Sequence, residues 1–501
     1  MNICKKHLTF QEREVAILRQ AVDEAYEKQA RQLVSSPEIK KIVDILENFL
    51  RRKKLICYGG TAINNILPKN DRFYDFDKEI PDYDFFSKDA LSDAKELADI
   101  YYKEGFKEVQ AKAGIHHGTY KVYVNFTGFA DITQLEPQLY NKLHKDAIVI
   151  NDIYYAPPNY LRMSMYLELS RPSGDISRWE KILKRSILLN KNYPISAKGC
   201  DPSIFQREFE NENVQTINNI KNEEYKIFGI LKNLLIDEGV VFFGGYATYL
   251  YGQYMPKEYK RLLSKTPDFD VLSINAEDTA QKVKIKLQQH GFDNVKIVKH
   301  TAIGEVIPVH YEIKIENETV AFIYQPLACH NYNEVTINNK KVKVATIDTM
   351  LSFYLAFIYA DRPYYDYKRI LCMAAFLFDV QKRNRLSQKG ILKRFSLNCY
   401  GEQQTLESIR SEKTKMFEEL KNKKSTKEYE SWFLNYNPVE IAQEKSQKRK
   451  DREREKRRKL RILEKEHQNY SSKSKTKKTQ TRTQNAGKKR RTIKNKKYFN
   501  Y

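Results

Sequence analysis

The chain has 501 residues, a formal net charge of +24, 41% hydrophobic residues and 12% aromatic residues. That length is enough for two or three domains, and the aromatic content excludes a chain that is disordered throughout. The most apolar run, residues 351–360, is half as long as a membrane span requires, and the first fifteen residues contain no apolar segment typical of a signal peptide. The composition therefore predicts a soluble intracellular protein. The six cysteines are scattered without a C-x-x-C pair, which favours a reducing compartment and gives no zinc motif.

The positive charge is concentrated at the C-terminal end of the chain. Residues 441–501 hold 24 basic and 6 acidic residues, whereas the preceding 440 residues carry a net charge of only +6. Within this stretch, residues 441–467 are expected to form a charged helix and residues 471–501, with twelve basic residues and no acidic ones, to be disordered. The tail has three interpretations: nonspecific RNA binding, which we favour, a nuclear address, or a solubility device.

An internal repeat organises the rest of the sequence. A segment with helical periodicity, residues 39–54, leads into an apolar strand and a double glycine, LICYGGTA (55–62). Ser36, followed by Pro37, is the expected N-cap of that helix. The same order of features recurs at residues 225–247, about 185 positions later.

Three further pairs of motifs follow in the same order in both copies. PDYDFFS (81–87) matches PDFDVLS (267–273), and FADITQL (129–135) matches VAFIYQP (320–326). RPSGDISR, which begins at residue 171, matches RPYYDYKR 191 residues later. The chain is therefore predicted to contain a duplicated α/β (α+β) unit, in which each copy has a mixed sheet followed by helices.

The repeat and the composition together predict five segments. Residues 161–170 and 179–189 should be the helices that follow the first sheet, and the polar stretch 198–220 is interpreted as a linker. The expected segments are an N-terminal helical segment (1–34), a catalytic domain (35–197), the linker (198–220), a degenerate second domain (221–440) and the basic tail (441–501).

Three aspartates are the candidate metal ligands and catalytic residues. Asp82 and Asp84 are two positions apart on a predicted strand, so both side chains should project from the same face of the sheet. Asp131 lies between apolar residues, which is unfavourable for an acid unless a cation pairs it. We expect the three carboxylates at one sheet edge to hold magnesium or manganese ions for phosphoryl transfer.

A glycine turn supplies the candidate phosphate site. Gly59, Gly60 and Thr61 lie between the strand and a helix expected at about residues 62–67. Backbone N–H groups at a helix N-terminus attract phosphate, glycine permits close approach, and the Thr61 hydroxyl is a further donor. Residues 178–185 of the following helix carry a basic face with two interpretations. It is either a solvated face or the source of one or two side chains that reach the triphosphate. Under the second interpretation, Lys181 is a candidate ATP ligand.

YGGTAIN, PDYDFFS and FADI together resemble the signature of the DNA polymerase beta-like nucleotidyltransferases. More narrowly, residues 35–440 resemble the poly(A) polymerase catalytic subunits of large cytoplasmic DNA viruses. The resemblance implies ATP as substrate, an RNA 3′ end as acceptor, two magnesium ions, a homodimer and a location in a cytoplasmic viral factory or in the virion. The segment from Gly60 to Asp82 is longer than in the broader superfamily, and both copies share this feature.

The second copy lacks one of the three acids. Asp268 and Asp270 match the first pair, but Asp131 falls opposite Phe322, which can neither bind a metal ion nor accept a proton. The second copy is therefore expected to be catalytically inactive and to act as scaffold or RNA-binding surface. Two alternatives to adenylate addition remain at this stage: another RNA nucleotidyltransferase activity, such as terminal uridylyl transfer or oligoadenylate synthesis, and a noncatalytic RNA-binding role.

Overall fold

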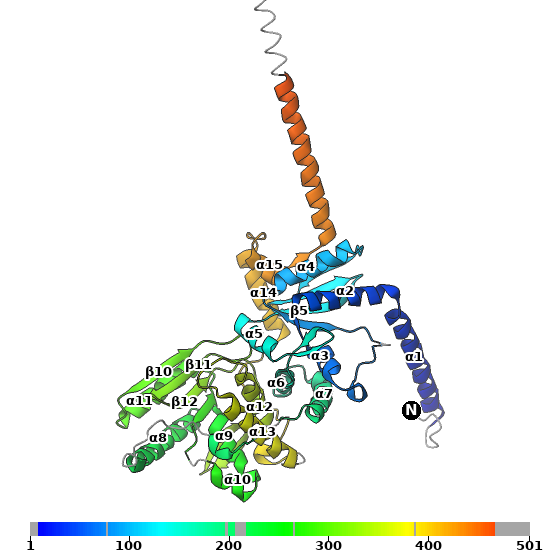
Figure 1. Cartoon of the computed structure of the whole chain (residues 1–501). Coiled ribbons are helices and arrows are strands. Elements are labelled where there is room, and N and C mark those ends of the chain that lie inside the picture. The colour runs from blue at the N-terminus through cyan, green and yellow to red at the C-terminus, as the bar shows by residue number, and fades with distance from the viewer. Residues whose placement is uncertain are drawn as a thin grey trace, which may run out of the picture. The chain divides into compact units, whose positions relative to one another are not determined.

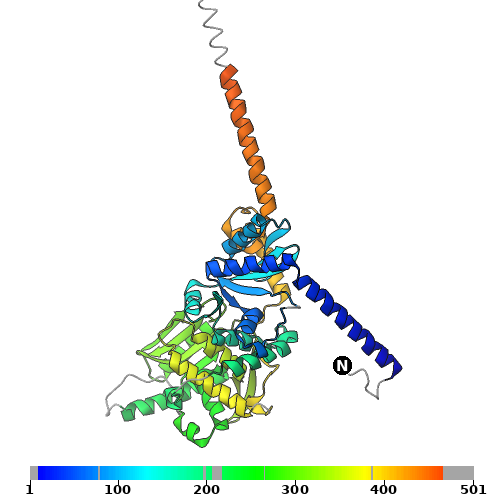
Figure 2. The same ribbon diagram turned by 45° about the vertical axis from the view of Figure 1, so that its right-hand side comes forward.

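The computed structural model contains two compact units, Met1–Tyr436 and Asn437–Tyr501. Figure 1 and Figure 2 show two β-sheets with their helices in the larger unit. In the smaller unit, residues 438–465 form an exposed helix, as predicted from their charge pattern. The predicted disorder of residues 471–501 lies outside the described residues. The structure describes residues 9–76, 79–195, 199–205, 217–263, 266–384 and 387–465.

The helix that precedes the first sheet illustrates how local sequence sets the elements. Helix α2 (Pro37–Lys53) begins where predicted, because the Ser36 hydroxyl accepts a hydrogen bond from the Ile39 backbone N–H at 3.1 Å. Its apolar residues recur every three or four positions and are buried. The helix ends at Lys54, which adopts a left-handed conformation with φ of 52°.

The first sheet has eight strands in the order β16-β3-β4-β5-β2-β1-β7-β6. Strand β2 runs parallel to β5 and antiparallel to β1, so the sheet is mixed, as predicted. The strands are β1 (Ile56–Tyr58), β2 (Tyr83–Ser87), β3 (Val109–Ala113), β4 (Thr119–Val124), β5 (Thr127–Gln134), β6 (Ile148–Ile150), β7 (Ile153–Tyr155) and β16 (Asn435–Tyr436).

The second sheet repeats this order as β10-β11-β12-β9-β8-β14-β13-β15. Each of its first seven strands corresponds to a strand of the first sheet, with the same parallel and antiparallel neighbours at its centre. The predicted mixed α/β class is therefore confirmed. The strands are β8 (Val241–Phe243), β9 (Phe269–Leu272), β10 (Val295–His300), β11 (His310–Ile315), β12 (Glu318–Tyr324), β13 (His330–Ile337), β14 (Lys340–Ala345) and β15 (Cys399–Tyr400).

Helices cover both faces of the first sheet and join the two repeats. Helices α2 and α4 pack on one face, and α3 and α6 lie on the other, where α6 packs against α12 of the second repeat. None of the helices in the described part of the chain is long and apolar enough to cross a membrane. The helices are α1 (Phe10–Val34), α3 (Gly59–Ile66), α4 (Ala90–Lys103), α5 (Pro137–Lys145), α6 (Pro158–Leu169), α7 (Trp179–Asn192), α8 (Ile217–Asp237), α9 (Gly244–Tyr251), α10 (Lys257–Leu262), α11 (Ala276–Gln289), α12 (Ile347–Phe357), α13 (Tyr367–Asn384), α14 (Leu406–Leu420) and α15 (Lys427–Phe433).

Two of the predicted segment boundaries need correction. The stretch 198–220 was interpreted as linker, but α8 begins inside it at Ile217. Residues 401–440 were assigned to the second repeat, but β16 pairs with β3 and adds an edge strand to the first sheet. An edge strand leaves backbone hydrogen-bonding groups open to any extended segment, so a distant part of the chain can complete the first sheet.

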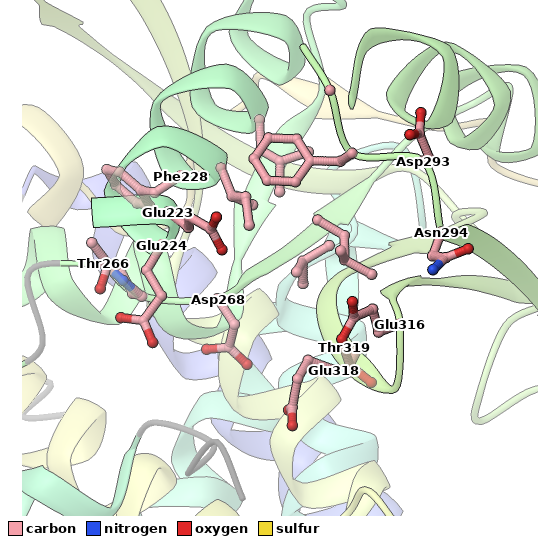
Figure 3. Close-up of a pocket in the computed structure, with 17 residues that line it drawn as sticks. Glu223, Glu224, Phe228, Thr266, Asp268, Asp293, Asn294, Glu316, Glu318 and Thr319 are labelled. Atoms are coloured by element: carbon pink, nitrogen blue, oxygen red, sulfur yellow. The ribbon is translucent and has the colours of Figure 1, made fainter. Parts of the chain in front are cut away.

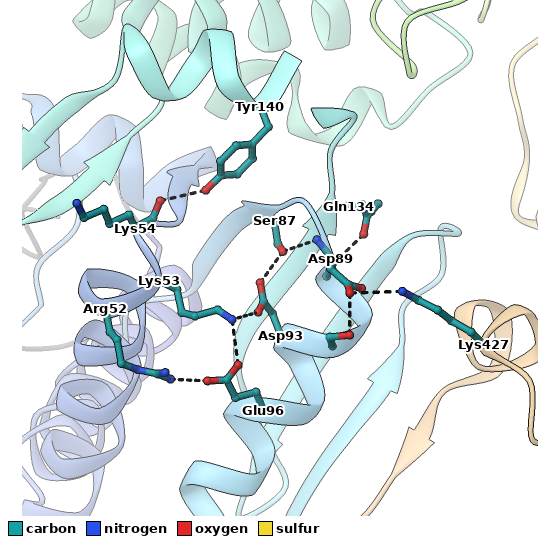
Figure 4. A network of polar contacts seen from close by, with 12 residues as sticks. Arg52, Lys53, Lys54, Ser87, Asp89, Asp93, Glu96, Gln134, Tyr140 and Lys427 are labelled. Carbon is teal, nitrogen blue, oxygen red and sulfur yellow. Dashed lines mark hydrogen bonds and ion pairs between the residues drawn. The ribbon is translucent and has the colours of Figure 1, made fainter. Parts of the chain in front are cut away.

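A polar network fixes the end of β2, the strand that carries Asp84 (Figure 4). The Ser87 hydroxyl, at the last residue of β2, donates a hydrogen bond of 2.5 Å to the Asp93 carboxylate. Asp93 is 5% exposed and forms an ion pair of 2.7 Å with Lys53 of α2. Because a buried carboxylate is costly unless it is paired, these contacts hold β2, α2 and α4 in one arrangement.

Four of the five cysteines among the described residues form disulfides, which does not fit the reducing compartment that the scattered cysteines favoured. Cys200 joins Cys372, and Cys329 joins Cys399, with Cα–Cα distances of 5.4 and 5.2 Å. The partners are 172 and 70 residues apart in the sequence, so only the folded chain brings them together. Cys57 is buried and free.

Candidate active site

Four side chains form a row across the centre of the first sheet. Tyr58 on β1 is in register with Asp84 on β2, Asp84 with Asp131 on β5, and Asp131 with Lys121 on β4. Residues directly opposite each other on neighbouring strands place their side chains on the same face. The predicted neighbours Asp84 and Asp131 therefore lie side by side. They lie on central strands rather than at the predicted sheet edge, because both repeats place the parallel pair in the middle of the sheet.

Asp82 immediately precedes β2 and is exposed to solvent. Partial desolvation of its carboxyl group and the negative charge of Asp131 raise its pKa. At Asp84, burial first, and then the charges of Asp82 and Asp131, raise the pKa to about 7. These shifts express the cost of burying carboxylates and of holding like charges close together, a cost that a bound cation would reduce.

Lys121 is a site residue that the sequence analysis missed. Its ammonium group forms a short ion pair with Asp131 Oδ2. Among the described residues, no group of three or more His, Cys, Asp or Glu side chains has the arrangement of a formed metal site. In this structure, then, Asp131 is paired with Lys121 rather than gathered with Asp82 and Asp84 into one ligand set.

The glycine turn packs against this row. Helix α3 begins at Gly59 rather than near residue 62, so both glycines belong to its first turn. Gly59 has φ of +72°, and a Cβ there would lie 2.3 Å from Asp84 Oδ2, so only glycine fits. The first N–H groups of a helix have no partner within the helix, and those of α3 lie beside the acidic row.

Thr61 differs from its predicted role as a phosphate donor. Its side chain is buried, and its hydroxyl donates a hydrogen bond of 2.6 Å to the Asp82 carbonyl oxygen. This bond ties the first turn of α3 to the residue that begins the D-x-D motif. The structure therefore gives Thr61 a positioning contact.

Helix α7 brings positive charge to the glycine turn. Arg185 donates a hydrogen bond of 2.6 Å to the Tyr74 hydroxyl, and a Cβ on Gly60 would lie 2.9 Å from the Arg185 guanidinium. The neighbouring charge of Arg185 is the main cause that lowers the pKa of Lys181, and Asp82 acts in the opposite direction. Lys181 and Arg185 thus share one positive region near Gly60 and Asp82. Lys184, by contrast, is exposed and pairs with Glu180 at 2.5 Å.

The equivalent row in the second repeat keeps one aspartate but has lost the counterparts of Asp131 and Lys121. At the corresponding register, Phe243, Asp270, Phe322 and Glu312 replace Tyr58, Asp84, Asp131 and Lys121. This register confirms that Phe322 stands opposite Asp270, as the repeat alignment predicted. Phe322 is fully buried, and its ring centroid is 4.8 Å from that of Tyr364. Aromatic rings thus occupy the space that the first repeat keeps for charged groups.

The second repeat also contains a cavity of about 460 Å³ (Figure 3). Its floor is apolar, carboxylates surround it, and no Lys or Arg side chain lines it among the residues that the structure describes. An acidic cavity repels the phosphates of a nucleic acid, so this cavity does not support the RNA-binding alternative, and the scaffold or RNA-binding role of the second copy stays a prediction. The acidic lining residues are Glu223, Glu224, Asp268, Asp293, Glu316 and Glu318.

Comparisons with known proteins agree with this geometry. Residues 44–175 match the family model of the poly(A) polymerase catalytic subunit. A proposed poly(A) polymerase catalytic subunit of African swine fever virus is 35% identical over 165 residues, which are 32% of this chain and 34% of that protein. The corresponding protein of Acanthamoeba polyphaga mimivirus is 32% identical over 162 residues, or 32% of this chain and 27% of its own length. The chain thus spans about a third of the length of the curated relatives that it matches.

The fold resemblance extends much further than the sequence matches. The crystal structure of the Megavirus polyadenylate synthase superposes with a TM-score of 0.71 over 87% of each chain, at 19% identity. The matched segment 44–175 contains the glycine turn, Lys121 and the three aspartates, whereas α7 lies beyond it. Residues 44–175 are therefore similar to the poly(A) polymerase catalytic subunit family, which confirms, for this part of the chain, the resemblance seen in its sequence.

Proposed function

We propose that this chain transfers AMP from ATP to the 3′-hydroxyl of RNA without a template and releases pyrophosphate. The observation that carries the proposal is the row of Asp84 and Asp131 beside the first turn of α3. In this reaction the 3′-oxygen forms a bond to the α-phosphorus, the bond between the α- and β-phosphates breaks, and the hydroxyl proton is lost. The names of the African swine fever virus and mimivirus relatives support the same activity.

The residues of the site fit divalent cations of the magnesium type. Asp82, Asp84 and Asp131 offer hard oxygen ligands, and burial, followed by the negative charges of Asp82 and Asp131, raises the pKa of Asp84, an electrostatic cost that a cation would reduce. When bound, two such ions would lower the pKa of the 3′-hydroxyl and neutralise charge on the departing pyrophosphate. Asp131, on the neighbouring strand, would face the acceptor hydroxyl.

The remaining groups would orient the triphosphate. Backbone N–H groups at Gly59 and Gly60 would bind phosphate oxygens, since both glycines lie in the first turn of α3 and carry no side chain that would cover them. Lys181 and Arg185 would add positive charge from α7. The Arg185 guanidinium is held in place by Tyr74, so it loses little conformational freedom on binding.

An extension assay tests the proposal. Labelled RNA is incubated with the full chain, magnesium or manganese, and each nucleotide separately, and the products are sequenced. We expect long 3′ adenylate tracts with ATP and little extension with the other nucleotides. Uridylate tracts, or 2′-5′ linked products, would assign the site to another nucleotidyltransferase activity, and unextended RNA that nevertheless binds would indicate a noncatalytic protein.

We also propose that the chain forms a homodimer. Helix α1 exposes Val15, Leu18, Val22 and Tyr26 at a spacing of three or four residues, which makes an apolar stripe on one side of the helix. Sedimentation of the full chain over a range of concentrations tests the assembly. Because relatives come from African swine fever virus and mimivirus, we propose a cytoplasmic viral factory or the virion as its location, which immunofluorescence of infected cells would test.

A further inference from the structure

The Lys121–Asp131 ion pair has no part in the proposed reaction. The two residues face each other directly in the register of β4 and β5, so two regular strands fix the contact. Their side chains are 38% and 21% exposed. At that exposure, either group can exchange its partner for water or for another ion at a modest desolvation cost.

Lys121 is the charge that balances the acidic row in this structure. Besides its bond to Asp131, its positive charge acts on both Asp82 and Asp84 and opposes the effect of their mutual repulsion. It therefore lies where a cation is electrostatically favoured, next to the third candidate metal ligand. With Asp131 held by Lys121, the three carboxylates do not form a complete ligand set among the described residues.

The second repeat gives an independent indication that Lys121 and Asp131 act as a pair. Where Asp131 is replaced by Phe322, the position of Lys121 is occupied by Glu312. Glu312 instead accepts a hydrogen bond of 2.5 Å from the Thr319 hydroxyl and lies 2.9 Å from His300. The lysine is thus absent from the repeat that lacks the acid at the position of Asp131.

We propose that Lys121 is a built-in counter-ion that competes with the divalent cation for Asp131. In this view the ammonium group holds the third carboxylate away from the other two until a divalent ion displaces it. The pair would thereby keep the acidic row stable without metal and raise the metal concentration needed to fill the site. This inference rests on the proposed function, in which Asp82, Asp84 and Asp131 hold the ions.

The test measures Mn²⁺ binding to the full chain without nucleotide, by the electron paramagnetic resonance signal of free Mn²⁺. Lys121→Met should bind Mn²⁺ about tenfold more tightly than the natural protein, because a neighbouring positive charge is removed. Lys112→Met is the matched control, because this substitution removes the same charge from an exposed residue that lies opposite Lys121 on β3. It should leave the affinity nearly unchanged.

The double variant Lys121→Met with Asp131→Asn locates the effect. It should bind Mn²⁺ much less than tenfold more tightly than Asp131→Asn alone, because the competition requires the Asp131 carboxylate and only the longer-range repulsion by Lys121 is then removed. Unchanged or weaker binding by Lys121→Met, with Asp131→Asn still impaired, would overturn the role of Lys121 and leave the proposed function intact. If Asp84→Asn and Asp131→Asn both bound Mn²⁺ like the natural protein, the metal site itself would be wrong, and this inference with it.

Discussion

The two repeats share a sheet order and differ mainly in what their central row contains. The first row holds Tyr58, Asp84, Asp131 and Lys121, and the second holds Phe243, Asp270, Phe322 and Glu312. Three of the four positions have changed chemistry, while the strands beneath them kept their register. The scaffold therefore tolerates either a charged site or an aromatic core in the same place.

The difference extends to the helix that follows each sheet. At the offset of 191 residues that aligns the repeats, Lys181 and Arg185 of α7 correspond to Cys372 and Phe376 of α13. Cys372 forms a disulfide, and Phe376 is buried. Without the positive charges of Lys181 and Arg185, these positions can pack, and apolar packing stabilises the fold where a cluster of unpaired charges would not.

The largest predicted effect is a difference in the rate of nucleotide addition between substitutions of equivalent aspartates in the two repeats. Asp131→Asn and Asp84→Asn should each lower the rate of nucleotide addition about a thousandfold or more, because the row then loses a charged oxygen ligand. Asp270→Asn, the counterpart in the second repeat, should change the rate less than severalfold. Steady-state extension rates at saturating ATP and RNA decide this. Equal losses in both repeats would mean that the second site takes part in the chemistry.

A second prediction concerns the attempt to restore the lost acid. Phe322→Asp should not create activity in an Asp131→Asn background, and it should destabilise the second repeat by about 3–5 kcal/mol, because a large buried ring is replaced by a carboxyl group beside Asp270. Thermal unfolding followed by circular dichroism measures the loss. Phe322→Leu is the control and should cost about 1 kcal/mol. Restored activity without loss of stability would show that the second row is still a working site.

The charges on α7 should have an intermediate effect. Arg185→Ala should reduce kcat/KM for ATP about tenfold to a hundredfold, since a charge-assisted contact at the Gly60 turn is lost. Lys184→Ala removes a charge from the next position of the same helix, where the side chain pairs only with the exposed Glu180 in the described contacts. The Lys184→Ala variant should leave kcat/KM nearly unchanged. Equal losses in the two variants would mean that the positive charge of α7 as a whole, and not a specific contact of Arg185, affects ATP use.

The smallest predicted effect concerns stability and pH. Because the pKa of Asp84 is raised from 3.8 to about 7 in the folded protein, its carboxyl group favours folding while protonated. That contribution is present below about pH 4 and is lost as the pH rises through 7. Asp84→Asn should therefore melt at a higher temperature than the natural protein at pH 8 in EDTA, with little difference at pH 4.5. A variant that is less stable at pH 8 would contradict the electrostatic cost assigned to the row.

The sequence by itself determined the repeat, the mixed sheets, the D-x-D motif beside the glycine turn, and the loss of an acid at Phe322. These features depend on local patterns: alternation along strands, helical periodicity, a capping serine and the order of short motifs. Asp84 and Asp131 could be predicted as neighbours because the repeat preserves the order of their strands. The contact of Thr61 could not be predicted, because the hydrogen bond from its hydroxyl to the Asp82 carbonyl oxygen depends on how α3 packs on the loop before β2.

Only the tertiary structure decided which other groups meet the acids. Lys121 stands opposite Asp131 because of the β4–β5 register, and a one-residue shift would turn it to the other face. Arg185 reaches Gly60 from more than a hundred residues away, because α7 packs beside the first turn of α3. The β16 edge strand and the two disulfides likewise join segments that are distant in the chain. Such contacts depend on the packing of whole elements, which no local pattern in the sequence records.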